Sequence, residues 1–313
     1  MTANDSRHVP VLLHEAVEAL QPRPGGVYVD GTFGGGSHSS LLASKIGPNG
    51  VIVAFDRDPD VAARADALAG ETEPEVFFVP DSFARMTDHL GRLDLGSVDG
   101  VLLDLGISSL QLDAAERGFS FLREGPLDMR MDPSEGRSAE VLIATAGESE
   151  LVEILFSYGE ERQARRIARA IVSERKSNPV RTTTQLAELV ERTIGRPPGS
   201  RIHPATRTFQ ALRIAVNNEL VELQQGLEAA LGCLAPRGRL VVISFHSLED
   251  RIVKQFIARE VKGCICPPDQ PVCTCGRVSM LKTVGKPVRP SDAEVERNPR
   301  SRSAIMRVAE CLP

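Results

Sequence analysis

Apolar runs alternate with amphipathic stretches along the first hundred residues. The apolar runs are short and nearly continuous, which predicts buried strands at 27–29, 51–55, 76–79 and 98–103. Helical spacing between them predicts helices at 14–20, 41–46 and 60–68, and Pro22, Pro24 and the turn at 47–50 separate the elements. Apolar strands that are separated by helices indicate a parallel sheet covered on both faces.

This alternation stops after Asp104 and returns near residue 218. Residues 113–204 show no comparable strand but contain helical stretches at 149–157 and 164–174. A helix at 218–231, a connection at 232–238, a fifth strand at 239–245 and a late strand at 303–308 follow. We therefore expect one discontinuous Rossmann-like α/β domain, residues 1–112 and 205–313, with an inserted helical domain for substrate recognition at 113–204.

Composition is that of an ordinary globular protein, with 42% hydrophobic and 25% charged residues. No apolar run approaches the roughly 18–20 residues of a membrane helix, so we expect no membrane association. The first ten residues lack the apolar core of an export signal. Four of the six cysteines crowd into one short loop. We therefore expect reduced thiols and a cytoplasmic location.

Positive charge is clustered, although the formal net charge is −5. One cluster has seven basic residues against the single acid Glu174: Arg162, Arg165, Arg166, Arg169, Arg175, Lys176 and Arg181. Residues 196–213 add four arginines and His203 without an acid. These clusters favour contact with nucleic-acid phosphates, and affinity would then fall steeply with salt. Solvated helix faces are the simpler alternative.

A glycine-rich loop joins the first strand to the following helix. It reads Asp30-Gly31-Thr32-Phe33-Gly34-Gly35-Gly36-Ser37-His38. Glycines let the backbone approach a ligand, and acids at strand ends accept hydrogen bonds from ribose hydroxyls. Asp30, Asp56 and Asp104 each end a strand, and Asp56 has the ribose position. The alternative is a tight turn with helix-capping acids. Neither Gly31 nor Gly34 starts a G-x-G-x-x-G pattern, which disfavours a nicotinamide-dependent dehydrogenase.

Several ordered motifs between about His8 and Val308 resemble those of the MraW (RsmH) family. They are the glycine loop, Phe55-Asp56-Arg57-Asp58-Pro59, Leu103-Asp104-Leu105-Gly106-Ile107-Ser108-Ser109, Glu116-Arg117-Gly118-Phe119-Ser120-Phe121, Gly125-Pro126-Leu127-Asp128-Met129-Arg130-Met131-Asp132, His203-Pro204-Ala205-Thr206-Arg207-Thr208-Phe209-Gln210 and Ile243-Ser244-Phe245-His246-Ser247-Leu248-Glu249-Asp250-Arg251. The family comprises bacterial methyltransferases of cytosine N4 in small-subunit (16S) ribosomal RNA. The resemblance implies a class I S-adenosylmethionine-dependent fold, with 16S rRNA as partner, within the small ribosomal subunit.

The resemblance also implies a set of cofactor-binding residues: Gly36, Ser37, His38, Asp56, Phe83, Asp104 and Gln111. Asp56 would bind the ribose, and Phe83 would stack on the adenine unless it is a plain core residue. Two positions depart from many relatives. Ser37 replaces a glycine but keeps its backbone N–H, whereas Leu110 replaces a proline and puts the Gln111 contact in doubt.

Methylation of an exocyclic amine needs an acceptor for its N–H, because the lone pair is delocalised into the ring. Asp104, at the end of the fourth strand, is our candidate for this catalytic role as well as for cofactor binding. His246 follows the fifth strand and is the second catalytic candidate, with a purely structural role as the alternative.

Cys264, Cys266, Cys273 and Cys275 raise the question of a zinc site, although C-x-C pairs are less typical than C-x-x-C pairs. Free thiols are the alternative, and we assign no metal ligand from the sequence.

Three other functions remain open. A dehydrogenase would be stabilised by NADH, and a non-catalytic RNA-binding module would leave rRNA unmethylated. A DNA amino-methyltransferase would carry D/N-P-P-Y/F where this chain has Asp104-Leu105-Gly106-Ile107.

Overall fold

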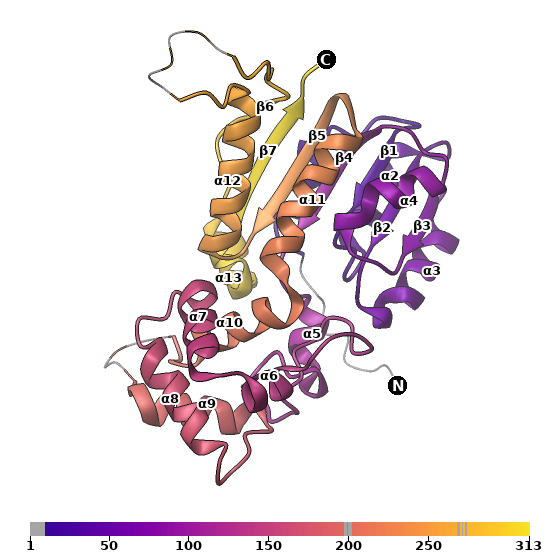
Figure 1. The fold of residues 1–313 in the computed structure, drawn as a ribbon. Coiled ribbons are helices and arrows are strands. Elements are labelled where there is room, and N and C mark those ends of the chain that lie inside the picture. Colours follow the sequence, from indigo (N-terminus) through magenta and orange to yellow (C-terminus); the bar gives the residue numbers. More distant parts are fainter. Residues whose placement is uncertain (1–9, 197–198, 200–201, 268–269, 271, 273) are drawn as a thin grey trace. The chain divides into compact units, whose positions relative to one another are not determined.

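The computed structural model describes residues 10–196, 199, 202–267, 270, 272 and 274–313, and these form two compact units (Figure 1). The first unit contains the described residues up to Gly106 together with Leu220–Pro313, and the second is Ile107–Glu219. The second unit extends beyond the expected insertion, 113–204, at both ends. Its hydrophobic core explains this, because Leu112 and Leu212 both pack into it.

Seven strands of the first unit form one sheet in the order β3-β2-β1-β4-β5-β7-β6. They are β1 (Val27–Asp30), β2 (Val51–Phe55), β3 (Glu75–Val79), β4 (Val98–Asp104), β5 (Leu234–Ser244), β6 (Leu281–Thr283) and β7 (Ile305–Cys311). β7 is antiparallel to both of its neighbours, and the other pairs are parallel. This confirms the Rossmann-like class I methyltransferase fold, with its order of strands reversing beside β1 and β4.

Helices cover both faces of this sheet: α1 (Leu13–Ala19), α2 (Ser37–Ile46), α3 (Ala62–Glu71), α4 (Met86–Arg92), α11 (Glu219–Cys233) and α12 (Ser247–Lys262). A further short helix, α13 (Asp292–Arg297), has no buried side chain. Single 3₁₀ turns lie at η1 (Pro59–Val61), η2 (Phe83–Arg85) and η4 (Pro299–Ser303). Successive strand residues point to opposite faces. Val29 therefore joins the cluster that includes α4, α11 and α12, whereas Tyr28 joins the one that includes α1, α2 and α3. Burial of both faces explains the continuous apolar runs.

The regular secondary structure in the described residues of the second unit is helical, apart from one isolated bridge between Pro126 and Thr182. Its elements are α5 (Ser109–Asp113), η3 (Ala115–Arg117), α6 (Ala139–Thr145), α7 (Glu148–Gly159), α8 (Ala164–Glu174), α9 (Thr183–Ile194) and α10 (Thr206–Asn217). Leu155 of α7, Ile167 of α8 and Leu186 of α9 lie in its core. The helical stretch predicted at 164–174 coincides with α8.

The structure corrects the start of the fifth strand. Residues 232–238 are not simply a connection, because β5 begins at Leu234. The register steps from Val98 opposite Leu234 to Gly100 opposite Arg239, and Arg237 has a φ of 67°. The irregular residues before Arg239 thus interrupt the strand, and their sequence pattern resembles that of a loop. Separately, no helix among the described residues has the length and apolar character of a membrane span.

Candidate active site

The glycine loop links the ends of three adjacent strands. The N–H of Gly31 donates to the carbonyl of Leu102 in β4 (2.8 Å), and that of Phe33 donates to Phe55 in β2 (2.9 Å). The loop enters α2 through Gly36, whose φ of 76° is the left-handed conformation that glycine adopts freely. A Cβ there would lie 2.7 Å from the Phe33 ring. The loop is therefore held by backbone bonds and depends on glycine at this position.

Asp30 and Asp56 use their carboxylates to hold this loop. Asp30 accepts from the Ser39 hydroxyl (2.6 Å), and Asp56 accepts from the backbone N–H of Gly34 (2.8 Å) and of Asp58 (2.9 Å). Burial, partly offset by these two N–H groups, raises the pKa of Asp56 to about 6. Burial also raises the pKa of Asp30. Each carboxylate thus has a structural task, and the second lone pairs stay available to a ligand.

Asp104 differs from the other two acids. Its Oδ1 is buried and has no hydrogen-bond partner among the described residues. Its Oδ2 lies 3.8 Å from Nδ1 of His38. Burial raises the pKa of Asp104 well above its ordinary value, and the charges of Asp30 and Glu249 add to the effect. An unsatisfied buried acceptor is rare in native proteins, and it indicates that a ligand supplies the missing donor.

Three predicted cofactor-binding residues lie at the beginning of α2. Gly36 is its N-cap, Ser37 is its first residue, and His38 is buried behind them. His38 Nε2 lies 3.3 Å from the carbonyl oxygen of Val11, so that Nδ1 faces Asp104. The first backbone N–H groups of a helix lack partners within the helix and suit a polar ligand. The structure therefore brings these three residues together with Asp104.

Phe83 lies in η2, and its ring packs on a helix of the same unit. A Cβ on Gly226 of α11 would lie 2.2 Å from this ring, and one on Gly31 would lie 3.0 Å from Phe83 Cβ. Phe83 is half-buried, so part of its surface is open beside the glycine loop. On the same helix, the carboxylate of Glu222 accepts hydrogen bonds from Arg57 (2.8 Å) and from the Ser82 hydroxyl (3.1 Å). These contacts fix the two loops that carry Asp56 and Phe83.

The structure gives His246 a helix-capping task. Its Nδ1 accepts from the N–H of Glu249 (3.4 Å), and its Nε2 lies 3.1 Å from Glu249 Oε1. Glu249 in turn accepts from the N–H of Phe245 and of His246, which completes a capping box at the start of α12. Both ring nitrogens thus face Glu249, and the catalytic role of His246 stays a prediction.

Gln111 belongs to the second unit, where it closes another capping box. Its side-chain oxygen accepts from the N–H of Ser108 (3.1 Å), and its own N–H donates to the Ser108 hydroxyl (3.2 Å). These hydrogen bonds fix Gln111, which follows the leucine that replaces the proline of many relatives. Its contact with a cofactor stays a prediction.

The basic clusters separate into structural and exposed members. Arg175 donates to the carbonyls of Ile143 (2.6 Å) and Ala146 (2.7 Å) at the end of α6. Arg213 forms a two-pronged ion pair with Glu219 (2.8 Å each). Acids from neighbouring helices also pair with these basic residues, although the local sequence has few acids. Glu148 of α7, for example, lies 3.7 Å from Arg169. Arg162 and Arg165 are exposed, whereas Arg201 lies outside the described residues.

Negative charge around the glycine loop limits which cofactor fits. Burial and the nearby charge of Asp30 raise the pKa of both Asp56 and Asp104, and the charge of Glu249 adds to the effect at Asp104. This environment repels a pyrophosphate and attracts a cation with hydroxyl donors. A sulfonium with a ribose meets that requirement, and a nicotinamide dinucleotide does not.

Two residues beside the site were given no role from the sequence. Thr32 accepts the backbone N–H of Asp104 on its hydroxyl (2.6 Å), and no pattern in the loop marks this contact. Glu249 is fully engaged in the cap of α12, and its spacing of three residues from His246 after a strand is the signal that identifies it.

The chain is similar to proteins of one family along nearly its whole length. A sequence profile of the MraW methylase family matches residues 5–312. The protein named Ribosomal RNA small subunit methyltransferase H in Geobacter sulfurreducens is 52% identical over 310 residues, covering 97% of this chain and 99% of its own. Its namesake in Heliobacterium mobile is 49% identical over 310 residues, with coverages of 97% and 98%. That of Thermomicrobium roseum is 52% identical over 307 residues, with coverages of 97% and 93%.

Proposed function

The chain belongs to the MraW methylase family, and from this premise we propose that it methylates the exocyclic N4 of a cytidine in 16S ribosomal RNA. S-adenosylmethionine is the methyl donor, and the small ribosomal subunit supplies the RNA. The relatives named above support RNA of the small subunit as the substrate. The observation that carries the proposal is the partnerless Oδ1 of Asp104 beside the glycine loop.

The residues around this loop suit S-adenosylmethionine. Gly36, Ser37 and His38 would hold the methionine part, and Asp56 would accept from the ribose hydroxyls. The exposed side of Phe83 would lie against the adenine. When bound, this cofactor supplies an electrophilic methyl group on a positively charged sulfur, which the carboxylates stabilise.

Asp104 prepares the amine for methylation. The N4 nitrogen of cytosine is a weak nucleophile because its lone pair is delocalised into the ring. Oδ1 of Asp104, which has no partner among the described residues, would accept a hydrogen bond from N4–H, and this bond would raise the electron density on nitrogen and orient the lone pair. The same oxygen takes the proton that the methylated nitrogen must lose, and the raised pKa of Asp104 suits this transfer.

The second unit contributes to RNA binding. Arg162 is exposed just before α8, and Arg165 is exposed on α8 itself. The opposite side of α8 buries Ile167 and Ile171. Arginines on such a helix contact phosphates and position the RNA without reading its sequence. The target cytosine must be unstacked for N4 to be reached, either by flipping or because the RNA is irregular there.

The test is incubation of small subunits from a strain that lacks this enzyme with S-adenosylmethionine labelled in its methyl group. We expect label in the 16S rRNA and protection of the chain against heat by S-adenosylmethionine. Protection by NADH alone would favour a dehydrogenase. Unlabelled rRNA, despite binding of the subunit, would favour a non-catalytic RNA-binding module. Either result contradicts the proposal.

A further inference from the structure

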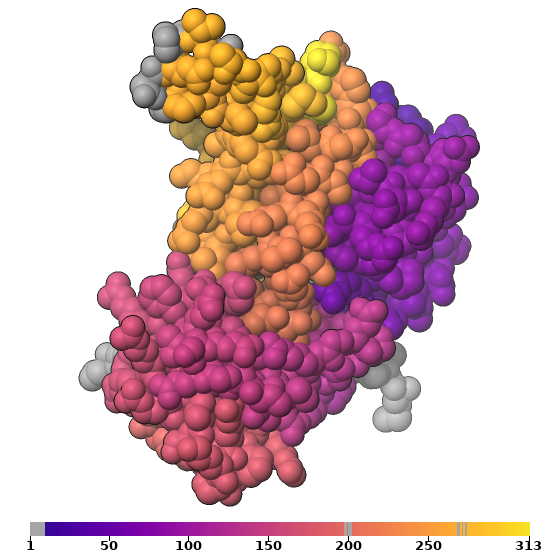
Figure 2. Space-filling model, in the orientation of Figure 1, coloured from indigo at the N-terminus to yellow at the C-terminus, as the bar shows by residue number. Residues whose placement is uncertain are grey.

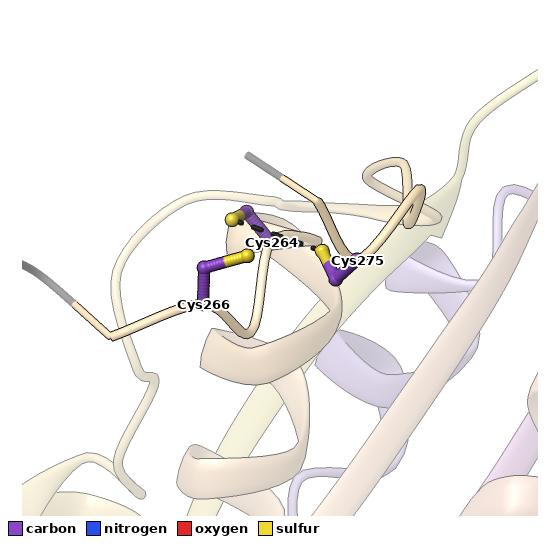
Figure 3. A group of neighbouring side chains, drawn as sticks. All are labelled: Cys264, Cys266 and Cys275. Atoms are coloured by element: carbon purple, nitrogen blue, oxygen red, sulfur yellow. Dashed lines mark hydrogen bonds between the residues drawn. The ribbon is translucent and has the colours of Figure 1, made fainter. Parts of the chain in front are cut away.

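A loop with several cysteines follows α12 and leads to β6. It protrudes from the end of that helix in the ribbon and in the space-filling view (Figures 1 and 2). Cys264, Cys266 and Cys275 come from its two ends, and their sulfur atoms all lie within 4.8 Å of one another (Figure 3). All three are half-buried, and none is in a disulfide. The fold thus places three thiols close together, whereas the C-x-C spacing in the sequence could not decide between a metal site and free thiols.

The separation of the sulfur atoms matches metal coordination. Cys264 and Cys275 have their sulfurs 3.8 Å apart. A disulfide would need about 2.05 Å. Four sulfurs at 2.3 Å from a tetrahedral zinc ion lie about 3.8 Å from one another, by simple geometry. The observed pair therefore has the spacing of two zinc ligands.

Contacts at the base of the loop bring its two ends together. Gly263 has a φ of 65°, and a Cβ on it would lie 2.5 Å from the backbone of Val278 and Ser279. The Ser279 hydroxyl donates to the carbonyl of Val261 (2.8 Å), and Arg277 pairs with the buried Glu260 (3.0 Å). The sheet unit therefore sets the approach of Cys275 to Cys264.

The described apolar side chains along this loop are largely exposed. Ile265 is 58% exposed, and Val272 and Val278 are each 68% exposed. Residues that bury so little surface gain little free energy from becoming ordered. Small segments of this kind are commonly held by a disulfide or by a structural metal ion. The spacing of the sulfurs favours the metal.

Backbone groups also face one of the sulfurs. The N–H groups of Thr274 and Cys275 hydrogen-bond to the thiol of Cys266. Such bonds support a ligand from outside the coordination sphere and fix its orientation. Soft thiolates select zinc over the hard ions Mg²⁺ and Ca²⁺.

We propose that Cys264, Cys266 and Cys275 bind a structural zinc ion. Each thiol releases a proton to solvent on binding, and no atom changes its oxidation state. By sequence, Cys273 is the candidate for the fourth ligand, and it lies outside the described residues. The site is remote from the reaction, because α12 begins at His246 beside the strand ends and its 16 residues span about 24 Å before Cys264. Zinc binding is therefore independent of the proposed methyl transfer.

The first experiment measures metal in the full chain, made without a metal-binding tag and analysed by mass spectrometry. We expect about one zinc ion per chain. Cys264→Ser, Cys266→Ser and Cys275→Ser should each lower the zinc content at least fivefold. Cys311→Ala is the matched control, because this thiol lies in β7 outside the cluster of three sulfurs, and its zinc content should equal that of the wild type.

A second measurement keeps the proposal testable if the serine variants fail to fold. Cobalt replaces zinc in the wild-type chain, and tetrahedral thiolate sites then show intense visible and near-ultraviolet absorption. We expect this signature, and Cys273→Ser tests the fourth position. Two results overturn the proposal: wild-type chain without zinc after reduction and zinc addition, or a Cys264–Cys275 disulfide in chain isolated under reducing conditions.

Discussion

At the scale of single residues, the site depends on how each of three similar acids is partnered. Asp30 and Asp56 accept hydrogen bonds within the protein, and of these three acids Asp104 alone has a buried oxygen to which no described residue donates. Under the proposed mechanism, replacing Asp104 therefore removes an interaction with the substrate. Replacing Asp56 instead weakens the loop as well as the cofactor contact.

Asp104→Asn is expected to lower kcat by about a hundredfold or more, because the neutral amide oxygen is a weaker acceptor for N4–H and cannot take the proton. Binding of S-adenosylhomocysteine should change far less than turnover. Asp66→Asn, an exposed acid of α3, is the matched control and should keep wild-type turnover. Full turnover of Asp104→Asn would disprove the acceptor role.

Cofactor affinity is expected to weaken below about pH 6, because the pKa of Asp56 is raised to about 6 by burial. Ribose hydroxyls donate to the ionised carboxylate, so protonation competes with binding. The dissociation constant should be constant above pH 7 and rise about tenfold for each unit below the pKa. Calorimetry with S-adenosylhomocysteine from pH 5 to 8 measures this.

The pKa values of Asp30 and Asp104 are raised too, so a variant must isolate Asp56. Asp56→Asn should bind more weakly and lose most of the pH dependence. An unchanged pH dependence in this variant would assign the effect to another group.

At the scale of elements, the sequence predicts a helix or strand well where the hydrophobic period and the residues that end an element agree. The strand at 51–55 and the helix at 164–174 match β2 and α8, because an apolar run or a helical period leaves one choice. The site is less accessible to sequence. The spacing places Asp104 at a strand end, but only the fold leaves its Oδ1 without a donor. The antiparallel β7 and the three-residue β6 depend on pairing across the sheet, which no local period encodes.

Arg175→Ala is expected to destabilise the second unit by about 1–3 kcal/mol, because the carbonyls of Ile143 and Ala146 lose their donor. Lys176→Ala, its exposed neighbour, should change the free energy of unfolding by less than about 0.5 kcal/mol. Chemical denaturation of the two variants compares them. Equal stabilities would mean that Arg175 has no structural role.

The double variant Arg162→Ala/Arg165→Ala should fold normally and bind rRNA more weakly. Affinity falls as salt rises, so the plot of log affinity against log salt concentration has a negative slope. For every phosphate that is no longer neutralised by an arginine, this slope should become less steep by about 0.7–0.9. Arg64→Ala on α3 is the control, since it removes an exposed arginine of the sheet unit. A salt slope that the double variant shares with the wild type would show that these side chains do not contact phosphates.

At the scale of the whole molecule, charge is divided between the two units. The carboxylates around the glycine loop suit a cationic cofactor and repel RNA phosphates, while Arg162 and Arg165, the exposed arginines proposed to contact RNA, belong to the helical unit. Each unit also has its own hydrophobic core. An insertion into an α/β sheet thus lets one chain combine a site for a sulfonium with a surface for a polyanion.

The central claim is methylation at N4 of cytidine, and identification of the modified nucleoside tests it most directly. Small subunits from a strain without the enzyme are incubated with the purified chain and S-adenosylmethionine, and the 16S rRNA is digested and analysed by mass spectrometry. The account predicts N4-methylcytidine at one position, formed far more slowly when Asp104→Asn replaces the wild type. A methyl group on carbon 5, on a ribose or on another base would contradict it.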